Sequence, residues 1–155
     1  MKKRIPIGIT DFKKLIEGNF YYVDKTLFIQ EVWQQGGEVT LCLRPRRFGK
    51  TINLSTMHYF FEKTAEANAH LFDNLAIAGD AEMVQLQGQY PVITLSFKDV
   101  KEMTWDVAYE KICMLITTEF KRHHQLFQHL NFTVPTAHTT YFETICQDKG
   151  NLADY

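Results

Sequence analysis

Cysteine is scarce in this sequence. The three that are present, Cys42, Cys113 and Cys146, are far apart and form no C-x-x-C pair. An odd number of separated cysteines provides no disulfide framework, and Cys42 and Cys113 lie in apolar surroundings. We therefore expect buried thiols in a reducing compartment.

Long apolar runs and net charge are lacking as well. No stretch approaches the roughly 20 apolar residues that a membrane-spanning helix needs, and the basic start, MKKRIPIGIT, has no apolar run long enough for a signal peptide. The net charge is -1, so there is no general electrostatic attraction to nucleic acid or to an anionic membrane. These absences predict a cytoplasmic protein with no membrane partner.

What is present is the composition of a folded domain. The chain has 155 residues, 45% of them hydrophobic and 23% charged, which is enough for one domain with a sizeable core. Any anion binding must come from a local cluster of positive charge. The densest cluster consists of Arg44, Arg46, Arg47 and Lys50.

Helical patterns occur at four places along the chain. Apolar residues recur at helical spacing after Asp24, which is expected to cap that helix, and again after Lys50. A long helix is expected to follow Thr104, and another is predicted at about residues 137 to 147. Between the second and third helices, HLFDNLAIA (70–78) is expected to be a short helix or turn, and GDAEMVQLQGQ (79–89) an exposed connection.

Two short apolar runs predict buried strands. They are EVTLCL (38–43) and YPVITLSF (90–97), both rich in residues that favour extended structure. The resulting order is strand, helix, connection, strand, helix. This order predicts an α/β fold in which parallel strands are joined by helical crossovers.

The segment RPRRFGKT (44–51) carries the strongest chemical signal. The phosphate-binding loop pattern is G-x-x-x-x-G-K-[ST], and Gly49, Lys50 and Thr51 match its end, whereas Arg44 stands where the first glycine belongs. Average residue usage gives a G-K-[ST] triplet by chance in ~5–10% of chains of this length. Its placement between a predicted strand and a predicted helix is what the chemistry requires.

Each residue of this segment has an expected role. Free amides of the loop and first helical turn attract phosphate, and Gly49 lets the backbone approach it. Lys50 can reach the β and γ phosphates, and the Thr51 hydroxyl can bind Mg²⁺. Phe48 is expected to anchor the loop to the core. The candidate nucleotide-binding residues are Arg46, Arg47, Phe48, Gly49, Lys50, Thr51 and Ile52. Lys50 is the candidate catalytic residue and Thr51 the candidate metal ligand.

Several segments together resemble a known family. IPIGITDFKKLIEGNFYYVDKTLFI, TLCLRPRRFGKT, LFDNLAIAG and YPVITLSFKDV, in that order, are similar to the bacterial AAA-ATPase-like family. Its members typically carry an N-terminal P-loop ATPase domain followed by a domain that resembles PD-(D/E)XK nucleases. The family's loop itself begins with Arg-Pro-Arg-Arg-Phe, so Arg44 fits it. The resemblance implies ATP and Mg²⁺ as cofactors and a P-loop NTPase-type three-layer sandwich with a mostly parallel sheet.

One part of the family pattern is missing. The second acidic motif, an apolar strand that ends in Asp-Glu, does not occur after the long helix, where the acids are Glu143, Asp148 and Asp154. We therefore expect residues 1–155 to be the N-terminal portion of such a domain, with an incomplete sheet. Residues 1–37 would form a lead-in segment and helix, and residues 38–155 a partial nucleotide-binding core. The full-length family context implies an ATPase, but this chain alone is expected to be inactive.

The expected partners follow from that incompleteness. Nucleotide is the expected ligand, and the uncovered sheet edge predicts self-association, because unpaired edges pair with other chains. Nucleic acid is expected only through the missing C-terminal domain.

Alternative interpretations of the same residues remain open. The basic loop also suits a binder of nucleic-acid backbone, and a scaffold with a vestigial P-loop is a third interpretation. Asp24 is either a simple helix cap or a neighbour of the nucleotide base, and Tyr21 and Tyr22 either pack in the core or stack on the base. His123 and His124 are expected at the surface rather than on a metal.

Overall fold

The structure is a computed structural model that describes residues 3–64, 67–129 and 144–145. It divides into two units, Met1–Val92 and Ile93–Tyr155.

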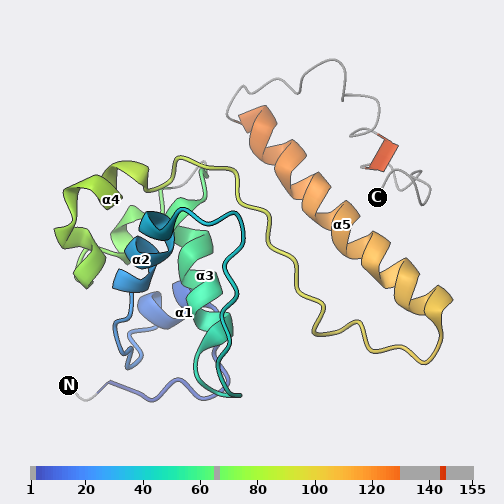
Figure 1. Cartoon of the computed structure of the whole chain (residues 1–155), viewed down its shortest axis with the longest axis horizontal. Helices are drawn as coiled ribbons and strands as arrows, with labels where there is room; N and C mark the ends of the chain where they lie inside the picture. The colour runs from blue at the N-terminus through green and yellow to red at the C-terminus, as the bar shows by residue number, and fades with distance from the viewer. Residues whose placement is uncertain (1–2, 65–66, 130–143, 146–155) are drawn as a thin grey trace. The chain divides into compact units, whose positions relative to one another are not determined.

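Unit 1, Met1–Val92, is built from short helices grouped around the longest of them, α3 (Figure 1). The elements in chain order are α1 (Phe12–Glu17), α2 (Leu27–Gln35), α3 (Lys50–Phe61), the 3₁₀ turns η1 (Ala69–Leu71) and η2 (Ala76–Gly79), and α4 (Ala81–Leu86).

Local signals account for most of these helix ends. Asp11 and Asp80 cap α1 and α4, because their carboxylates accept hydrogen bonds from first-turn amides. Gly36 ends α2 in the left-handed conformation, at φ 60°. The start of α3 at Lys50 and the end of α2 confirm the sequence predictions, whereas α4 was expected to be an exposed connection. That expectation was wrong because Met83 is buried in the core.

Phenylalanine rings form the centre of unit 1. The ring of Phe72 lies 5.0 Å from that of Phe12 and 5.2 Å from that of Phe60, measured between centroids. Ile29, Ile77 and other apolar side chains complete a core in which every member is almost fully buried. Because these residues come from α1, α2, α3 and both 3₁₀ turns, their packing holds the helices together.

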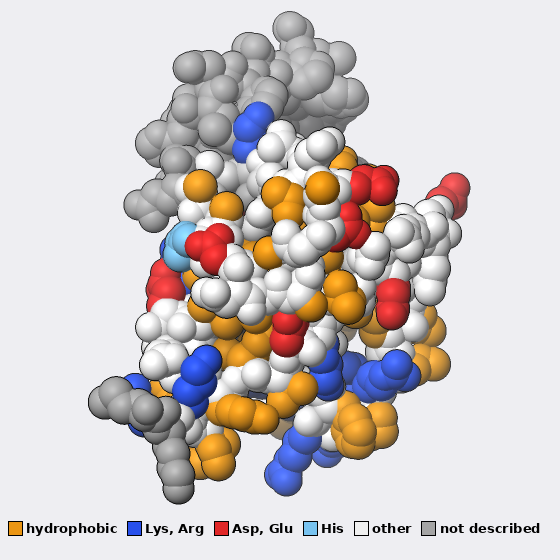
Figure 2. Space-filling model, turned by 90° about the vertical axis from the view of Figure 1, so that its left-hand side faces the viewer, with side chains coloured by type: hydrophobic (Ala, Val, Ile, Leu, Met, Phe, Trp, Pro, Cys, Tyr) orange, Lys and Arg blue, Asp and Glu red, His pale blue; other side chains and the backbone are white. Residues whose placement is uncertain are grey.

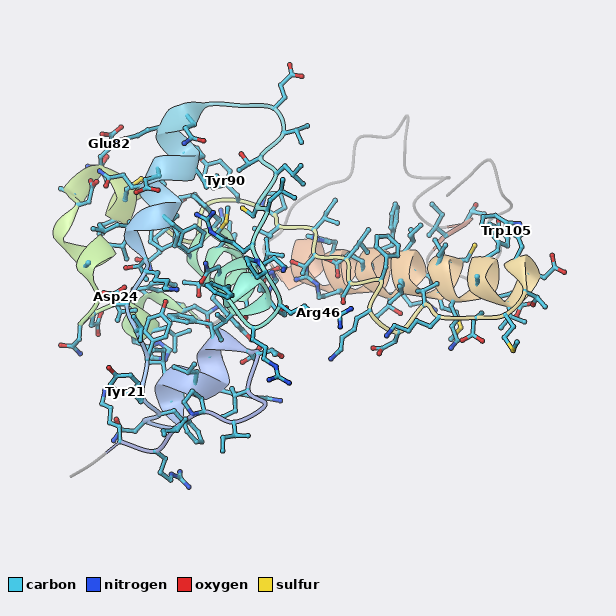
Figure 3. All side chains as sticks on the ribbon, turned by 60° about the horizontal axis from the view of Figure 1, so that its bottom comes forward. Tyr21, Asp24, Arg46, Glu82, Tyr90 and Trp105 are labelled. Atoms are coloured by element: carbon cyan, nitrogen blue, oxygen red, sulfur yellow. The ribbon has the colours of Figure 1, made fainter. Side chains whose placement is uncertain are left out.

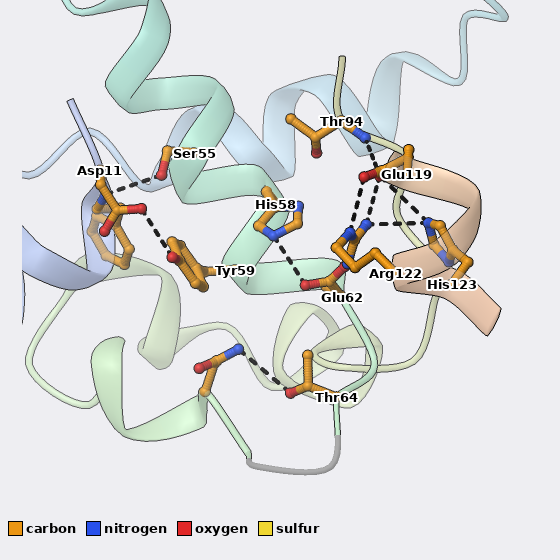
Figure 4. Close-up of polar contacts among 12 residues, drawn as sticks. Asp11, Ser55, His58, Tyr59, Glu62, Thr64, Thr94, Glu119, Arg122 and His123 are labelled. Carbon is orange, nitrogen blue, oxygen red and sulfur yellow. Dashed lines mark hydrogen bonds and ion pairs between the residues drawn. The ribbon is translucent and has the colours of Figure 1, made fainter. Parts of the chain in front are cut away.

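Polar contacts join α1 to α3 (Figure 4). The Tyr59 hydroxyl donates to Oδ2 of Asp11 at 2.9 Å, and the amide of Phe12 donates to Oγ of Ser55 at 3.0 Å. Burial, followed by the hydrogen bond to Asp11, raises the pKa of Tyr59 to about 12. The joint therefore depends on a protonated phenol.

The expected α/β sandwich with a mostly parallel sheet is wrong. In the described part of the chain there is no sheet, only the isolated parallel bridges Arg4–Phe20 and Glu62–Tyr90. Val39, Leu41 and Leu43, expected to be buried on both faces of a strand, are 87%, 76% and 74% exposed. An apolar run forms a strand only where a second strand pairs with it, and the described residues offer these side chains neither a partner strand nor a covering layer.

The second predicted strand fails in the same way. Residues 91–97 carry no regular secondary structure, and Ile93, Leu95 and Phe97 are exposed. Cys42, expected to be buried within the first strand, is exposed as well.

Unit 2, Ile93–Tyr155, contains the long helix α5 (Trp105–His129), which begins as predicted directly after Thr104. The Glu119 carboxylate gathers several partners there: the amide of Thr94 at 2.8 Å, Arg122 at 2.6 Å and His123 at 3.5 Å (Figure 4). Burial acts to raise the pKa of Glu119, but the bonds from Arg122 and Thr94 and the nearby positive charge hold it below its ordinary value.

His123 is buried and paired with Glu119, so its expected place at the surface was wrong. No group of three histidine, cysteine or acidic side chains suited to a metal occurs among the described residues. The helix predicted at about 137 to 147 lies outside the described residues, apart from Thr144 and Ile145, which are helical.

None of the helices in the described residues is both long and apolar enough to cross a membrane.

Replacing Tyr59 with phenylalanine tests the joint between α1 and α3. At neutral pH we expect the variant to be about 1 kcal/mol less stable to urea, the usual net value of one hydrogen bond. Because the pKa of Tyr59 is raised from 10.0 to about 12 in the folded chain, the unfolded chain loses this proton first. The wild type should therefore lose its advantage as the pH rises through that window. A stability difference that stays constant with pH would contradict the contact.

Candidate functional site

The loop of residues 44–49 leads directly into α3 and has an unusual backbone. Gly49 occupies the N-cap position at φ 81°, in the left-handed region. Arg47, two residues earlier, is also left-handed, at φ 67°. A residue with a side chain is strained in that conformation. Alternating left-handed residues are typical of backbone concavities that bind anions through their amides.

The N-terminus of α3 has no side-chain cap. Asp11 and Asp80 accept from amides at the start of α1 and α4, but no side chain of the described residues caps the first turn of α3. These amides carry the positive end of the helix dipole. The start of α3 is thus open to an anion.

Lys50 folds back over its own loop. Its ammonium group donates to the carbonyl oxygens of Arg44 and of Pro45, the latter at 3.1 Å. The side chain is exposed, but its charge is held against the loop that precedes α3. Thr51 follows on the first turn and is exposed.

Glycine is favoured at position 49 by the backbone conformation and by the space around it. A Cβ atom there would lie 3.3 Å from Cγ2 of Ile52, closer than carbon atoms normally approach, and the left-handed backbone would add strain.

A cavity of about 470 Å³ lies beside this loop in unit 1. Three segments supply most of its walls, namely Pro6 and Ile9, the segment 21–25 before α2, and the loop with the first turn of α3, and Leu15 of α1 adds to them. Figure 3 labels Tyr21 on the second of these segments and Arg46 on the loop. Most of the lining is apolar or aromatic, which is usual for small-molecule sites.

Charge at the cavity has one sign. Lys25 and Arg47 line it, and no acidic side chain is among the lining residues. In Figure 2, which views unit 1 from the side, most visible Lys and Arg side chains lie low on the face, with most of the Asp and Glu side chains above them. The positive charge suits an anionic ligand.

Some of the candidate residues line the cavity and others do not. Arg47, Phe48, Gly49 and Ile52 line the cavity, whereas Arg46 is exposed outside it, and Lys50 and Thr51 lie at the start of α3. Phe48 is 60% exposed, so it does not anchor the loop in the core as expected.

Other lining residues were not predicted, namely Pro6, Ile9, Leu15, Val23 and Asn53. Asn53 follows Lys50 by nearly one helical turn, a spacing that could have identified it. The four apolar residues carry no local signal, because their role depends on how segments far apart in the sequence are brought together.

The segment before α2 is fixed by a cluster of hydrogen bonds. Asp24 accepts from the amide and hydroxyl of Thr26, both at 2.8 Å, and from the amide of Ala76 at 2.7 Å. The buried Thr26 hydroxyl accepts from the amide of Ile77 at 3.2 Å. Asp24 therefore joins two distant segments. The prediction that Asp24 caps α2 was wrong, because Thr26 occupies the N-cap position.

These contacts also affect the charge on Asp24. Partial burial acts to raise its pKa, but the hydrogen bonds from Thr26 and Ala76 outweigh burial and place the pKa below its ordinary value. The ionised carboxylate is the form that accepts these bonds.

The other end of the segment is fixed to the N-terminal stretch. The amide of Tyr21 donates to the carbonyl of Arg4 at 2.8 Å, and the Arg4 guanidinium lies over the Phe20 ring, 4.9 Å from its centroid. Both walls opposite the loop are thus held in place.

Comparison with known proteins identifies the family. A family model described as "Predicted AAA-ATPase" matches residues 6–151. The chain belongs to this AAA-ATPase-like family. The resemblance inferred from RPRRFGKT and the neighbouring segments is confirmed.

A curated relative from Azotobacter chroococcum mcd 1 is described as "Uncharacterized protein in vnfD 5'region". It is 38% identical over 97 residues, which cover 62% of this chain and 17% of the relative. The match therefore spans about a sixth of that protein's length. No solved structure matches the chain.

Replacing Gly49 with alanine tests the loop geometry. We expect a loss of about 1–2 kcal/mol in unfolding free energy, because a left-handed alanine is strained by that amount and its Cβ crowds Ile52. The matched control is Gly79→Ala, since a Cβ at Gly79 meets nothing within 4 Å. Equal stability of the two variants in urea unfolding would show that Gly49 is not held in this conformation.

Proposed function

We propose that unit 1 binds ATP or ADP, with the phosphates on the loop of residues 47–51 and the first turn of α3. One observation carries the proposal: the Lys50 ammonium is held against the loop, directly before a helix N-terminus that no side chain caps. Membership of the predicted AAA-ATPase family supports it.

The chemistry of phosphate binding follows from these groups. Amides of the loop and of the first turn of α3 donate to phosphate oxygens. Lys50, which donates to carbonyls of Arg44 and Pro45, gains a charge-assisted bond when it turns to a phosphate instead. Arg47 adds positive charge at the edge of the cavity. The phosphates thus gain several donors and no opposing carboxylate.

Mg²⁺ would be held through Thr51. Its hydroxyl is exposed on the first turn of α3, where a nucleotide-bound metal would be within reach of an oxygen ligand. The described residues contain no cluster of acids to hold the metal from a second side. The proposal is therefore nucleotide binding; rapid hydrolysis needs a metal and water positioned from both sides.

The alternatives make different predictions for the same loop. A binder of nucleic-acid backbone needs basic residues spread over a face, whereas here they are concentrated beside a cavity with apolar walls. A vestigial loop would bind no nucleotide at all. Contact with nucleic acid through a nuclease-like domain, and a cytoplasmic location, stay predictions.

Replacing Lys50 with alanine tests the proposal. The wild type should bind Mg-ATP in a calorimetric titration, and Lys50→Ala should weaken binding about ten-fold or more, the value of one charge-assisted hydrogen bond. Lys98→Ala, which removes an exposed lysine from unit 2, should bind like the wild type.

A parallel titration with a short single-stranded oligonucleotide separates the alternatives. Lys50-dependent binding of the oligonucleotide without binding of ATP would favour a backbone binder. Binding of neither ligand by the wild type would favour the vestigial loop.

Self-association also stays a prediction, but it cannot use a sheet edge, since the described residues form no sheet. It depends instead on the exposed apolar side chains of Val39, Leu41 and Leu43, an arrangement that soluble monomers seldom leave uncovered. We expect sedimentation to show association that rises with concentration and is reduced by Leu41→Lys but not by Val84→Lys on α4. A monomer at all concentrations would contradict this.

A further inference from the structure

We propose that the cavity beside the loop takes the base and sugar of the nucleotide, with the base stacked on Tyr21. The inference rests on the proposed function, since it places the rest of a ligand whose phosphates lie on the loop.

Position is the first argument. Arg47, Phe48 and Gly49 belong to the loop and also line the cavity, as does Ile52 on the first turn of α3. A ligand whose phosphates meet the amides of this loop therefore has the cavity next to its remaining part. The volume of about 470 Å³ lies within the range of small-molecule sites.

The chemistry of the walls is the second argument. Pro6, Ile9 and Val23 present apolar surface, and Tyr21 and Phe48 present aromatic rings. Flat heterocycles stack on such rings regardless of base identity. Asn53 adds an amide that can donate and accept hydrogen bonds. These walls fit a neutral, flat base and leave the cations for the phosphates.

Tyr21 is distinguished from its neighbour by exposure. The Tyr22 ring packs edge-on against Phe12, with centroids 5.5 Å apart, and so belongs to the core. Tyr21 is 57% exposed, while its backbone is held by Arg4. It thus combines a fixed position with a free ring, as a stacking platform requires.

Asp24 acts as a positioning residue for this wall. Its bonds to Thr26 and to the amide of Ala76 hold the segment that carries Tyr21 and Lys25 (Figure 3). The wall is therefore formed before a ligand arrives.

The test compares ATP with inorganic tripolyphosphate, which has the phosphates but no base or sugar. Wild type should bind ATP more tightly than tripolyphosphate. Tyr21→Ala should weaken ATP binding about 5- to 150-fold, the range for loss of one aromatic stack, and leave tripolyphosphate binding unchanged. Tyr21→Phe, which keeps the aromatic ring, should bind ATP as tightly as the wild type.

Two controls separate this inference from the proposed function. Lys50→Ala should weaken both ligands, because it acts on the phosphates. Phe97→Ala removes a ring of unit 2 with nearly the same exposure, 55%, and should change neither.

The outcomes are distinguishable. If wild type binds tripolyphosphate as tightly as ATP, or if Tyr21→Ala binds ATP normally, the base does not lie in the cavity although the phosphate site stands. If Lys50→Ala changes neither ligand, the phosphate site itself fails and the inference with it. The comparison of ligands on the wild type decides the question even if Tyr21→Ala does not fold.

Discussion

The packing of Phe12, Phe60 and Phe72 sets the position of α3, and the candidate site of unit 1 depends on where α3 begins. Phe60 lies near the end of this helix and is fully buried, so the helix cannot shift without exposing it. The contact from Tyr59 to Asp11 adds a directional constraint to this apolar one. Together they present the first turn of α3, with Lys50 and Thr51, at the surface.

The candidate site is formed where that turn meets two other segments. The loop supplies amides and positive charge, and the segments around Pro6 and Tyr21 supply apolar walls. Neither part would suit a nucleotide alone, because phosphates need donors and a base needs a flat, dry surface. The residue that strains the backbone, Arg47 at φ 67°, lies at the junction of the two parts.

Structural features that depend only on residues close together in the sequence, such as helix ends, could be predicted from it. Gly36 ends a helix, Thr104 directly precedes one, and Gly49 followed by Lys50 begins one, because caps and helical periodicity act locally. The family could be identified for the same reason, from the contiguous segment RPRRFGKT.

Features that depend on distant partners were not predictable. The run from Val39 to Leu43 has the composition of a buried strand, but composition cannot supply the neighbouring strand that would bury it. The pairing of His123 with Glu119, one helical turn earlier, could have been predicted from their spacing, but the burial of His123 could not. The cavity is lined by residues as far apart in the sequence as Pro6 and Asn53, a juxtaposition that no periodicity encodes.

The hydrogen bonds around Asp24 restrict the amino-acid type on one of the two segments they join, but not on the other. On one side the contacts need particular side chains, a carboxylate at residue 24 and a hydroxyl at residue 26. On the other side they use only the backbone amides of Ala76 and Ile77. Position 76 is exposed and can accept any residue except proline, which has no amide hydrogen to donate. Position 76 should therefore tolerate many kinds of side chain, provided that the backbone keeps the path that presents its amide to Asp24.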